Sequence, residues 1–358
     1  MRDWSRHHPF LSFYLLAIAF PVVLFAYLAV MEAAAPDFYR PGVGVYRHFF
    51  DTMEALLREH PLLALHRDSV LVFVSTYALV PLAAPFLFFP FGPTASALIV
   101  TGVARGGAAV RALLGALAPM RGKLTARDGL RIYGLVLVTI AGLVAASLLV
   151  DLLATGGARI AALRRTWGLD APAAFLAGWS LALFTNQGGL LEELGWRGYA
   201  WPVLARSFRR PLVAATLLGI AWALWHFPRE IAPLLAGEQS LAHLVTWQLT
   251  FIAACVGMTV VAVTFVNYTG GSVLPAIMIH GTLNFLYQGF ETGRTGVRSD
   301  MTWEPTVVWV VAALVVLAMA GPELGWRRRM QINGGDGRSD PSNLWALPAK
   351  TDDTKVHA

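Results

Sequence analysis

The feature that most constrains this chain is its long apolar runs, which recur along most of the sequence. A helix that spans a bilayer needs roughly 20 mostly apolar residues. Runs of comparable length cover residues 9–31, 69–100, 129–153, 172–204, 211–227, 241–267, 272–290 and 306–321. The composition agrees, because 56% of the residues are hydrophobic and only 14% are charged, whereas soluble domains are about 25% charged. The sequence therefore predicts an all-α, polytopic transmembrane bundle of about eight helices.

Two of these runs need comment. The run 69–100 is interrupted by Pro81, Pro85, Pro90 and Pro93, which predicts either one kinked helix or a helix followed by a re-entrant piece. The run 9–31 is longer than the apolar part of a signal peptide and is not followed by a clear small-residue cleavage site. We therefore expect it to be a membrane anchor.

Basic residues gather in the loops between the runs and predict the topology. Clusters precede the first run and follow the second, fourth and last, which puts them on one side of an eight-helix bundle. That side is predicted to be cytoplasmic. The members are Arg2, Arg6, Arg105, Arg111, Arg121, Lys123, Arg127, Arg206, Arg209, Arg210, Arg327, Arg328 and Arg329. One loop disagrees, and it contains Arg159, Arg164 and Arg165.

This distribution accounts for the net charge of +6 without a nucleic-acid partner. We predict a multi-pass protein of the plasma membrane with both termini cytoplasmic and the lipid bilayer as a partner. The single cysteine, Cys255, lies inside an apolar run and is expected to be a small buried hydrophobic residue, so no internal disulfide can form.

The most informative stretch is residues 191–199, Leu-Glu-Glu-Leu-Gly-Trp-Arg-Gly-Tyr, which puts three charges into an apolar run. Ionisable groups at membrane depth each cost about 2.5–3.5 kcal/mol to insert, so they are candidates for function. Glu193 and Arg197 are four residues apart with the acid first, which favours a structural ion pair. Since adjacent helical residues point about 100° apart, this pairing leaves Glu192 as the free carboxylate.

Two more polar pairs with the same spacing lie in later apolar runs: Trp222…His226 and His280…Asn284. At 1.5 Å of helix rise per residue, Glu192, His226 and Asn284 lie about 20 Å from the predicted cytoplasmic turns, and His280 lies about 13 Å from its turn. We therefore expect these four side chains to converge in an intramembrane cavity. Trp222 is expected to pack beside them.

The grouping predicts amide hydrolysis. A carboxylate and an imidazole that share one water can activate it, which assigns Glu192 and His226 to that step. A second imidazole and a carboxamide, His280 and Asn284, can stabilise an oxyanion. Glu192, His226 and His280 are also three possible zinc ligands. Because an HExxH spacing and a clear carboxylate partner for the histidines are both missing from the sequence, we favour metal-free chemistry without a cofactor and keep zinc as the alternative.

At these residues the chain resembles the CPBP family of CAAX proteases and bacteriocin-processing enzymes, also called the type II CAAX prenyl endopeptidase family. The hallmark of that family is EExxxR, matched by Glu192, Glu193 and Arg197. An aromatic residue followed four positions later by His is matched by Trp222…His226, with Trp where the family often has Phe. His followed four positions later by Asn is matched by His280…Asn284. The resemblance covers roughly residues 172–290.

The resemblance implies an intramembrane endopeptidase that depends on Glu192 and cuts a membrane-anchored protein or peptide. The substrate would be of the prenylated CAAX type or of the bacteriocin or leader type. We expect N-terminal transmembrane helices and a basic loop over 1–170, a catalytic core over 171–290, a last helix over 291–326 and a polar, disordered tail over 327–358.

Two functions of other classes compete with this one. The same fold can serve as a catalytically silent scaffold or bacteriocin-immunity protein that binds a partner. A transporter can use intramembrane charges as a relay, but we find no inverted repeat in the sequence to support one.

Overall fold

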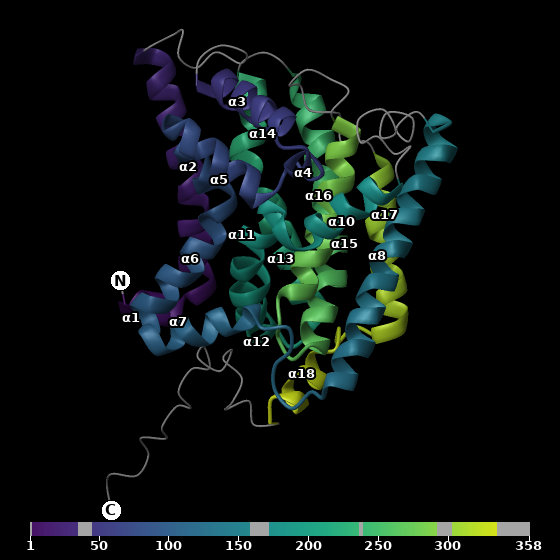
Figure 1. Ribbon diagram of the computed structural model, residues 1–358. Coiled ribbons are helices and arrows are strands. Elements are labelled where there is room, and N and C mark those ends of the chain that lie inside the picture. Colours follow the sequence, from purple (N-terminus) through teal and green to yellow (C-terminus); the bar gives the residue numbers. More distant parts are fainter. Residues whose placement is uncertain (1, 35–44, 158–171, 236–238, 292–302, 335–358) are drawn as a thin grey trace, which may run out of the picture.

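Helices that run side by side make up the architecture of the chain (Figure 1). The computed structural model describes residues 2–34, 45–157, 172–235, 239–291 and 303–334. Within these ranges no strand forms, and the only β-type contact is an isolated bridge between Ser69 and Asn186. The all-α bundle predicted from the apolar runs is confirmed.

The first part of the chain contains α1 (Arg2–His7), α2 (Pro9–Ala34), α3 (Val45–Glu59), α4 (Pro61–Ala64), α5 (Val70–Leu79), the 3-10 segment η1 (Pro81–Leu87), α6 (Phe88–Arg105), α7 (Gly107–Leu114), the 3-10 segment η2 (Gly115–Leu117) and α8 (Ala126–Thr155). The second part contains α10 (Pro172–Thr185), α11 (Gln187–Glu193), the π-helical segment η3 (Leu194–Ala200), α12 (Trp201–Ser207), α13 (Pro211–Trp225), α14 (Phe227–Leu235), α15 (Leu241–Tyr268), α16 (Leu274–Glu291), α17 (Trp303–Ala320) and α18 (Trp326–Ile332).

Each predicted apolar run is helical where the structure describes it, and two runs are broken. The run 69–100 is divided into α5, η1 and α6, as its prolines predicted, and Pro81 begins η1. The run 172–204 is divided into α10, α11, η3 and α12, a division that we did not predict. Five helices in the described ranges are long and apolar enough to cross a membrane, and shorter apolar helices lie in the other runs.

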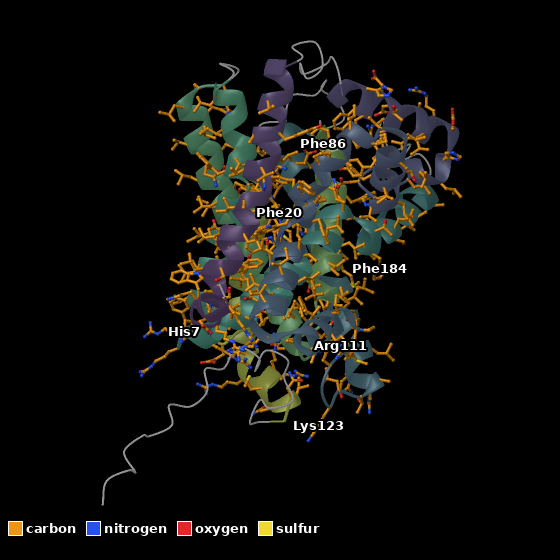
Figure 2. The ribbon with its side chains drawn as sticks, turned by 90° about the vertical axis from the view of Figure 1, so that its left-hand side faces the viewer. His7, Phe20, Phe86, Arg111, Lys123 and Phe184 are labelled. Atoms are coloured by element: carbon orange, nitrogen blue, oxygen red, sulfur yellow. The ribbon has the colours of Figure 1, made fainter. Side chains whose placement is uncertain are left out.

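The basic clusters lie at one end of the bundle. That end carries α1, α7, α12 and α18, whereas α3 and α14 lie at the opposite end (Figure 1). His7, Arg111 and Lys123 mark the basic end in Figure 2, while Phe86 lies near the other end. The predicted one-sided distribution therefore agrees with the structure for these clusters. Arg159, Arg164 and Arg165, the loop that disagreed, lie outside the described residues.

The bundle is built around α15. In the most apolar stretch of α15, 67% of the residues are buried inside the protein, whereas the corresponding fraction for α8 is 22%. Many large apolar side chains of the outer helices are exposed, among them Val138, Leu153, Leu314 and Met319. In a protein that lies in a bilayer, such side chains face lipid tails as apolar as themselves.

The start of the predicted disordered tail is ordered instead. Residues Trp326–Ile332 form α18, and the guanidinium-bearing residue Arg329 is only 2% exposed. The chain is fixed there because the N–H of Lys123 donates to the carbonyl of Ile332 (3.1 Å) and Asn333 Nδ2 donates to the carbonyl of Gly270 (3.0 Å). The prediction of disorder was wrong for these residues, and residues 335–358 lie outside the described ranges.

Glycine allows a close helix contact in the core between α13 and α15. A Cβ on Gly219 of α13 would lie 2.6 Å from Cα of Val256 in α15. Because Cα is a backbone atom, no side-chain rotation can relieve this overlap. Small residues at such crossings let helix backbones approach and pack.

We therefore expect Gly219→Ala to lower the free energy of unfolding by roughly 1–3 kcal/mol, the usual cost of overpacking. Gly142→Ala is the matched control, because nothing lies within 4 Å of its added methyl group and alanine favours a helix. Denaturant unfolding in detergent micelles measures both variants. An equal stability of the two would contradict the close α13–α15 contact.

Candidate active site

A break between two helices at Asn186 precedes the acidic motif. Asn186 follows α10 and caps α11, because its Oδ1 accepts the N–H of Gly189 at 3.0 Å. The acids end α11, and the π-helical segment η3 follows directly, where the N–H of Trp201 donates to the carbonyl of Trp196, five residues back. π-helical turns of this kind are frequent at functional sites. The predicted continuous helix over 172–204 was therefore wrong at Asn186, and the helix changes to π-helical geometry within the motif.

The predicted ion pair is present and fully buried. Arg197 Nη1 donates to Glu193 Oε1 at 2.9 Å, and both side chains are 0% exposed. Arg197 Nη2 donates to Thr259 Oγ1 on α15 at 3.0 Å, and the guanidinium lies 4.3 Å from the ring centre of Trp222. The pair thus connects the acidic motif to two other helices, α13 and α15.

Glu193 also holds His280, which we did not predict. His280 Nδ1 lies 2.8 Å from Glu193 Oε1. An ionised carboxylate only accepts hydrogen bonds, so the Nδ1 of His280 carries a hydrogen and donates it. The ring is thereby fixed with its other nitrogen, Nε2, directed towards Gly188, whose added Cβ would lie 3.1 Å away.

Trp222 does more than the packing that we predicted. Its indole Nε1 donates to Glu192 Oε2 at 3.0 Å, and its backbone carbonyl accepts from His226 Nδ1 at 2.9 Å. Its ring also meets the ring of His280 edge to face, with 5.2 Å between centroids. Trp222 therefore links Glu192, His226 and His280.

The bond to the Trp222 carbonyl also defines the state of His226. Because a carbonyl only accepts, Nδ1 of His226 carries the hydrogen and Nε2 of the neutral ring has the lone pair that a general base needs. Trp225 and Phe251 flank the ring, with centroids 4.6 and 4.9 Å from it. The imidazole is thus oriented on both sides by aromatic rings.

Asn284 lies next to the cap of α11. Its Nδ2 donates to Asn186 Oδ1 at 2.9 Å. A Cβ added to Gly188 would lie 2.7 Å from Asn284 Nδ2 and 3.1 Å from His280 Nε2. Both nitrogens therefore lie against the same glycine, near enough to each other for one oxyanion to accept from both.

The structure brings the predicted residues together through this set of contacts. Glu192 is buried and bound to Trp222, His226 and His280 adjoin Trp222, and Asn284 and His280 share the position at Gly188. Residues that sequence reasoning left without a role are Asn186 and Gln187, and it missed Asp68 entirely. No motif marks these three, and their contacts join positions more than a hundred residues apart.

The donors that zinc would use are arranged differently from a zinc site. Within the described ranges no three His, Cys, Asp or Glu side chains lie together as possible ligands of one ion. The bonds of Nδ1 of His226 to a carbonyl and of Nδ1 of His280 to Glu193 are also found in metal-bound histidines, and Glu193 is a carboxylate partner that the sequence did not reveal. Zinc therefore stays the alternative prediction, which a chelator tests directly.

The buried pair gives a prediction about stability. Glu193→Gln keeps the size of the side chain but leaves the charge of Arg197 unbalanced in a water-poor interior, so we expect it to lower the free energy of unfolding by roughly 3 kcal/mol or more. Thermal or denaturant unfolding in micelles measures the change.

A matched control is Glu323→Gln, which removes the acid of another i,i+4 pair, Glu323–Arg327, with 80% of the arginine side chain exposed. It should cost less than about 1 kcal/mol. If Glu193→Gln costs no more than this control, the assignment of Glu193–Arg197 as a structural pair is wrong.

Comparison with known proteins agrees with these motifs. Residues 172–286 match the family described as type II CAAX prenyl endopeptidase Rce1-like, a range that contains all seven residues predicted for the site and leaves Asp68 outside. CAAX prenyl protease 2 of Methanococcus maripaludis is 27% identical over 126 residues, which are 35% of this chain and 45% of that relative, so the match spans less than half of the relative. The family recognised in the motifs is thus supported by a similarity that covers residues 172–286 of this chain.

Proposed function

We propose that this protein is an intramembrane endopeptidase that hydrolyses a peptide bond of a membrane-associated substrate. The observation that carries the proposal is the convergence of a buried carboxylate, two imidazoles and a carboxamide. Glu192 and His226 are both bonded to Trp222, and Asn284 Nδ2 and His280 Nε2 both lie against Gly188. The match to the type II CAAX prenyl endopeptidase family supports the same class of activity.

In the proposed reaction Glu192 and His226 activate a water molecule. His226 offers the lone pair of Nε2, because its Nδ1 hydrogen is held by the Trp222 carbonyl. The water oxygen attacks the carbonyl carbon, and its proton passes to the Glu192–His226 pair. The pair then gives the proton to the leaving amine as the C–N bond breaks. Trp222 holds Glu192 in place through the indole bond.

Asn284 and His280 stabilise the oxyanion that forms on the attacked carbonyl. Asn284 contributes an Nδ2 hydrogen. His280 contributes its Nε2 hydrogen in the doubly protonated form of the ring, while Nδ1 remains bound to Glu193. Preorganised donors of this kind act strongly where water is scarce.

The name of the relative, CAAX prenyl protease 2, supports a substrate with a C-terminal prenylated CAAX sequence. A leader or bacteriocin-type peptide is the second substrate class that fits a membrane-embedded site. The basic end of the bundle, predicted to be cytoplasmic, supports a plasma-membrane protein with both termini inside the cell.

Glu192→Gln tests the activity. The change is nearly isosteric, and its carbonyl oxygen can still accept from Trp222, so the fold should be kept while the cleavage rate falls by roughly 10²–10⁴-fold. The measurement compares the termini of membrane proteins in cells with the wild-type chain or with Glu192→Gln at equal expression. Glu323→Gln changes an exposed ion pair, so cells with this variant should show the same termini as cells with the wild-type chain. Identical termini in all three strains, with each protein folded, would favour the scaffold or immunity function.

The same comparison in the presence of a chelator separates the two mechanisms. Metal-free chemistry expects the Glu192-dependent termini to persist, whereas a zinc protease would lose them. Parallel assays with farnesylated and unfarnesylated forms of one CAAX peptide ask whether the lipid is needed.

Gly188→Ala tests the two proposed oxyanion donors. Its methyl group would lie 2.7 Å from Asn284 Nδ2 and 3.1 Å from His280 Nε2, so these groups would have to move. We expect the rate to fall by about 10²-fold or more, as when an oxyanion donor is lost. Gly142→Ala is again the control, since its methyl group meets nothing within 4 Å. Rates are read on a peptide that spans a Glu192-dependent cleavage site, together with unfolding curves. A folded Gly188→Ala protein with the wild-type rate would contradict the assignment of these two nitrogens as the oxyanion donors.

A further inference from the structure

Asp68 reaches the site from a segment outside the family match. It lies between α4 and α5, is only 8% exposed, and stands 118 positions before Asn186 in the sequence. Its Oδ2 accepts from Asn186 Nδ2 at 2.9 Å and its Oδ1 from Gln187 Nε2 at 2.7 Å. Its backbone carbonyl accepts the N–H of Gln187 at 2.9 Å, so the segment is also held by the main chain.

These bonds fix the direction of the Asn186 carboxamide. An ionised carboxylate has no hydrogen to donate, so the end of Asn186 that faces Asp68 must be the NH₂ group. The other end, Oδ1, then faces the opposite way, where it accepts from the N–H of Gly189 at 3.0 Å and from Asn284 Nδ2 at 2.9 Å. Asn186 is 0% exposed, so water does not compete for these bonds.

The direction of Asn186 in turn fixes Asn284. Because Asn186 presents an oxygen, Asn284 must turn its NH₂ group towards it. One Nδ2 hydrogen is used there, and the second is left to donate to the reacting oxygen. If Asn284 rotated by half a turn about its Cβ–Cγ bond, its own oxygen would take the place of this nitrogen and repel an oxyanion.

We propose that Asp68 is a positioning residue that acts through Asn186 to hold the carboxamide of Asn284 with its NH₂ group towards the reacting oxygen. The inference rests on the proposed function, because it assigns the orientation of one of the oxyanion donors. It also makes the N-terminal part of the chain, outside the matched segment, a necessary part of the site.

The experiment measures kcat and KM on a peptide that spans a Glu192-dependent cleavage site. Asp68→Ala should lower kcat by roughly 10–100-fold, the usual effect of removing a residue that orients a reacting group, and leave KM nearly unchanged. Asp68→Asn should restore kcat to within about threefold of wild type. Its oxygen still accepts from Asn186, and the half-buried carboxamide of Gln187 can turn to meet the new NH₂ group.

Asn186→Ala and the double variant Asp68→Ala/Asn186→Ala complete a cycle. If Asp68 acts through Asn186, the double variant has the kcat of Asn186→Ala alone. Glu54→Gln is the control in the same segment: Glu54 binds Arg67, next in sequence to Asp68, and should leave kcat within about twofold of wild type. Unfolding curves verify that each variant is folded at the assay temperature.

Three outcomes overturn the inference. They are a wild-type kcat for Asp68→Ala, a kcat for Asp68→Asn as low as that of Asp68→Ala, and effects of the single variants that multiply in the double variant. In each of these cases, a Glu192→Gln variant without cleavage activity would still support the proposed function. If no Glu192-dependent cleavage exists at all, the proposed function fails, and the inference fails with it.

Discussion

The carboxylate of Glu193 is the group on which the rest of the site depends. One of its oxygens accepts from Arg197 at 2.9 Å and lies 2.8 Å from Nδ1 of His280, and all three side chains are buried. A charge in such surroundings costs several kcal/mol unless it is paired, so the motif cannot be buried without its arginine. Once it is paired, the same carboxylate orients an imidazole on α16, and the guanidinium reaches Thr259 on α15. The contacts that neutralise the charges of the motif are therefore the same contacts that fix the positions of the three helices.

Glycines make this arrangement sterically possible. A Cβ on Gly189 would lie 2.8 Å from the carbonyl of Ile277, and one on Gly281 would collide with the carbonyl of Ala182. The helix that bears His280, α16, thus touches α11, which bears the acids, at the first point and α10, which leads into α11, at the second. With larger residues the helices would stand further apart, and a bond of 2.8 Å between Glu193 and His280 could not form. The small residues around the motif determine the separation of the helices, and this separation allows the charged residues to bond across it.

The part of this arrangement that follows from local spacing was predictable from the sequence. The apolar runs gave the helices, and the i,i+4 spacing gave the Glu193–Arg197 pair because both residues are on one helix face. The bond between Glu193 and His280 joins positions 87 apart, and neither spacing nor hydropathy determines such a contact. The indole bond of Trp222 was missed for a related reason, since a tryptophan in an apolar helix is by default a packing residue. The break at Asn186 was missed because every residue of the run around it suits a membrane helix, while its capping role depends on contacts with Asp68 and Asn284.

The predicted reacting groups share one structural logic, in which each polar side chain is oriented by a group with a fixed hydrogen-bonding direction. The Trp222 carbonyl leaves His226 with its lone pair on Nε2, and the Glu193 carboxylate leaves His280 with its hydrogen on Nδ1. Asn186, itself oriented by Asp68, leaves Asn284 with its NH₂ group towards Gly188. A site at membrane depth has little water to satisfy a misdirected donor or acceptor, so each wrong orientation carries the full cost of an unsatisfied group. That cost selects one arrangement of amides and imidazoles, and it explains why a residue as remote in sequence as Asp68 is built into the same network.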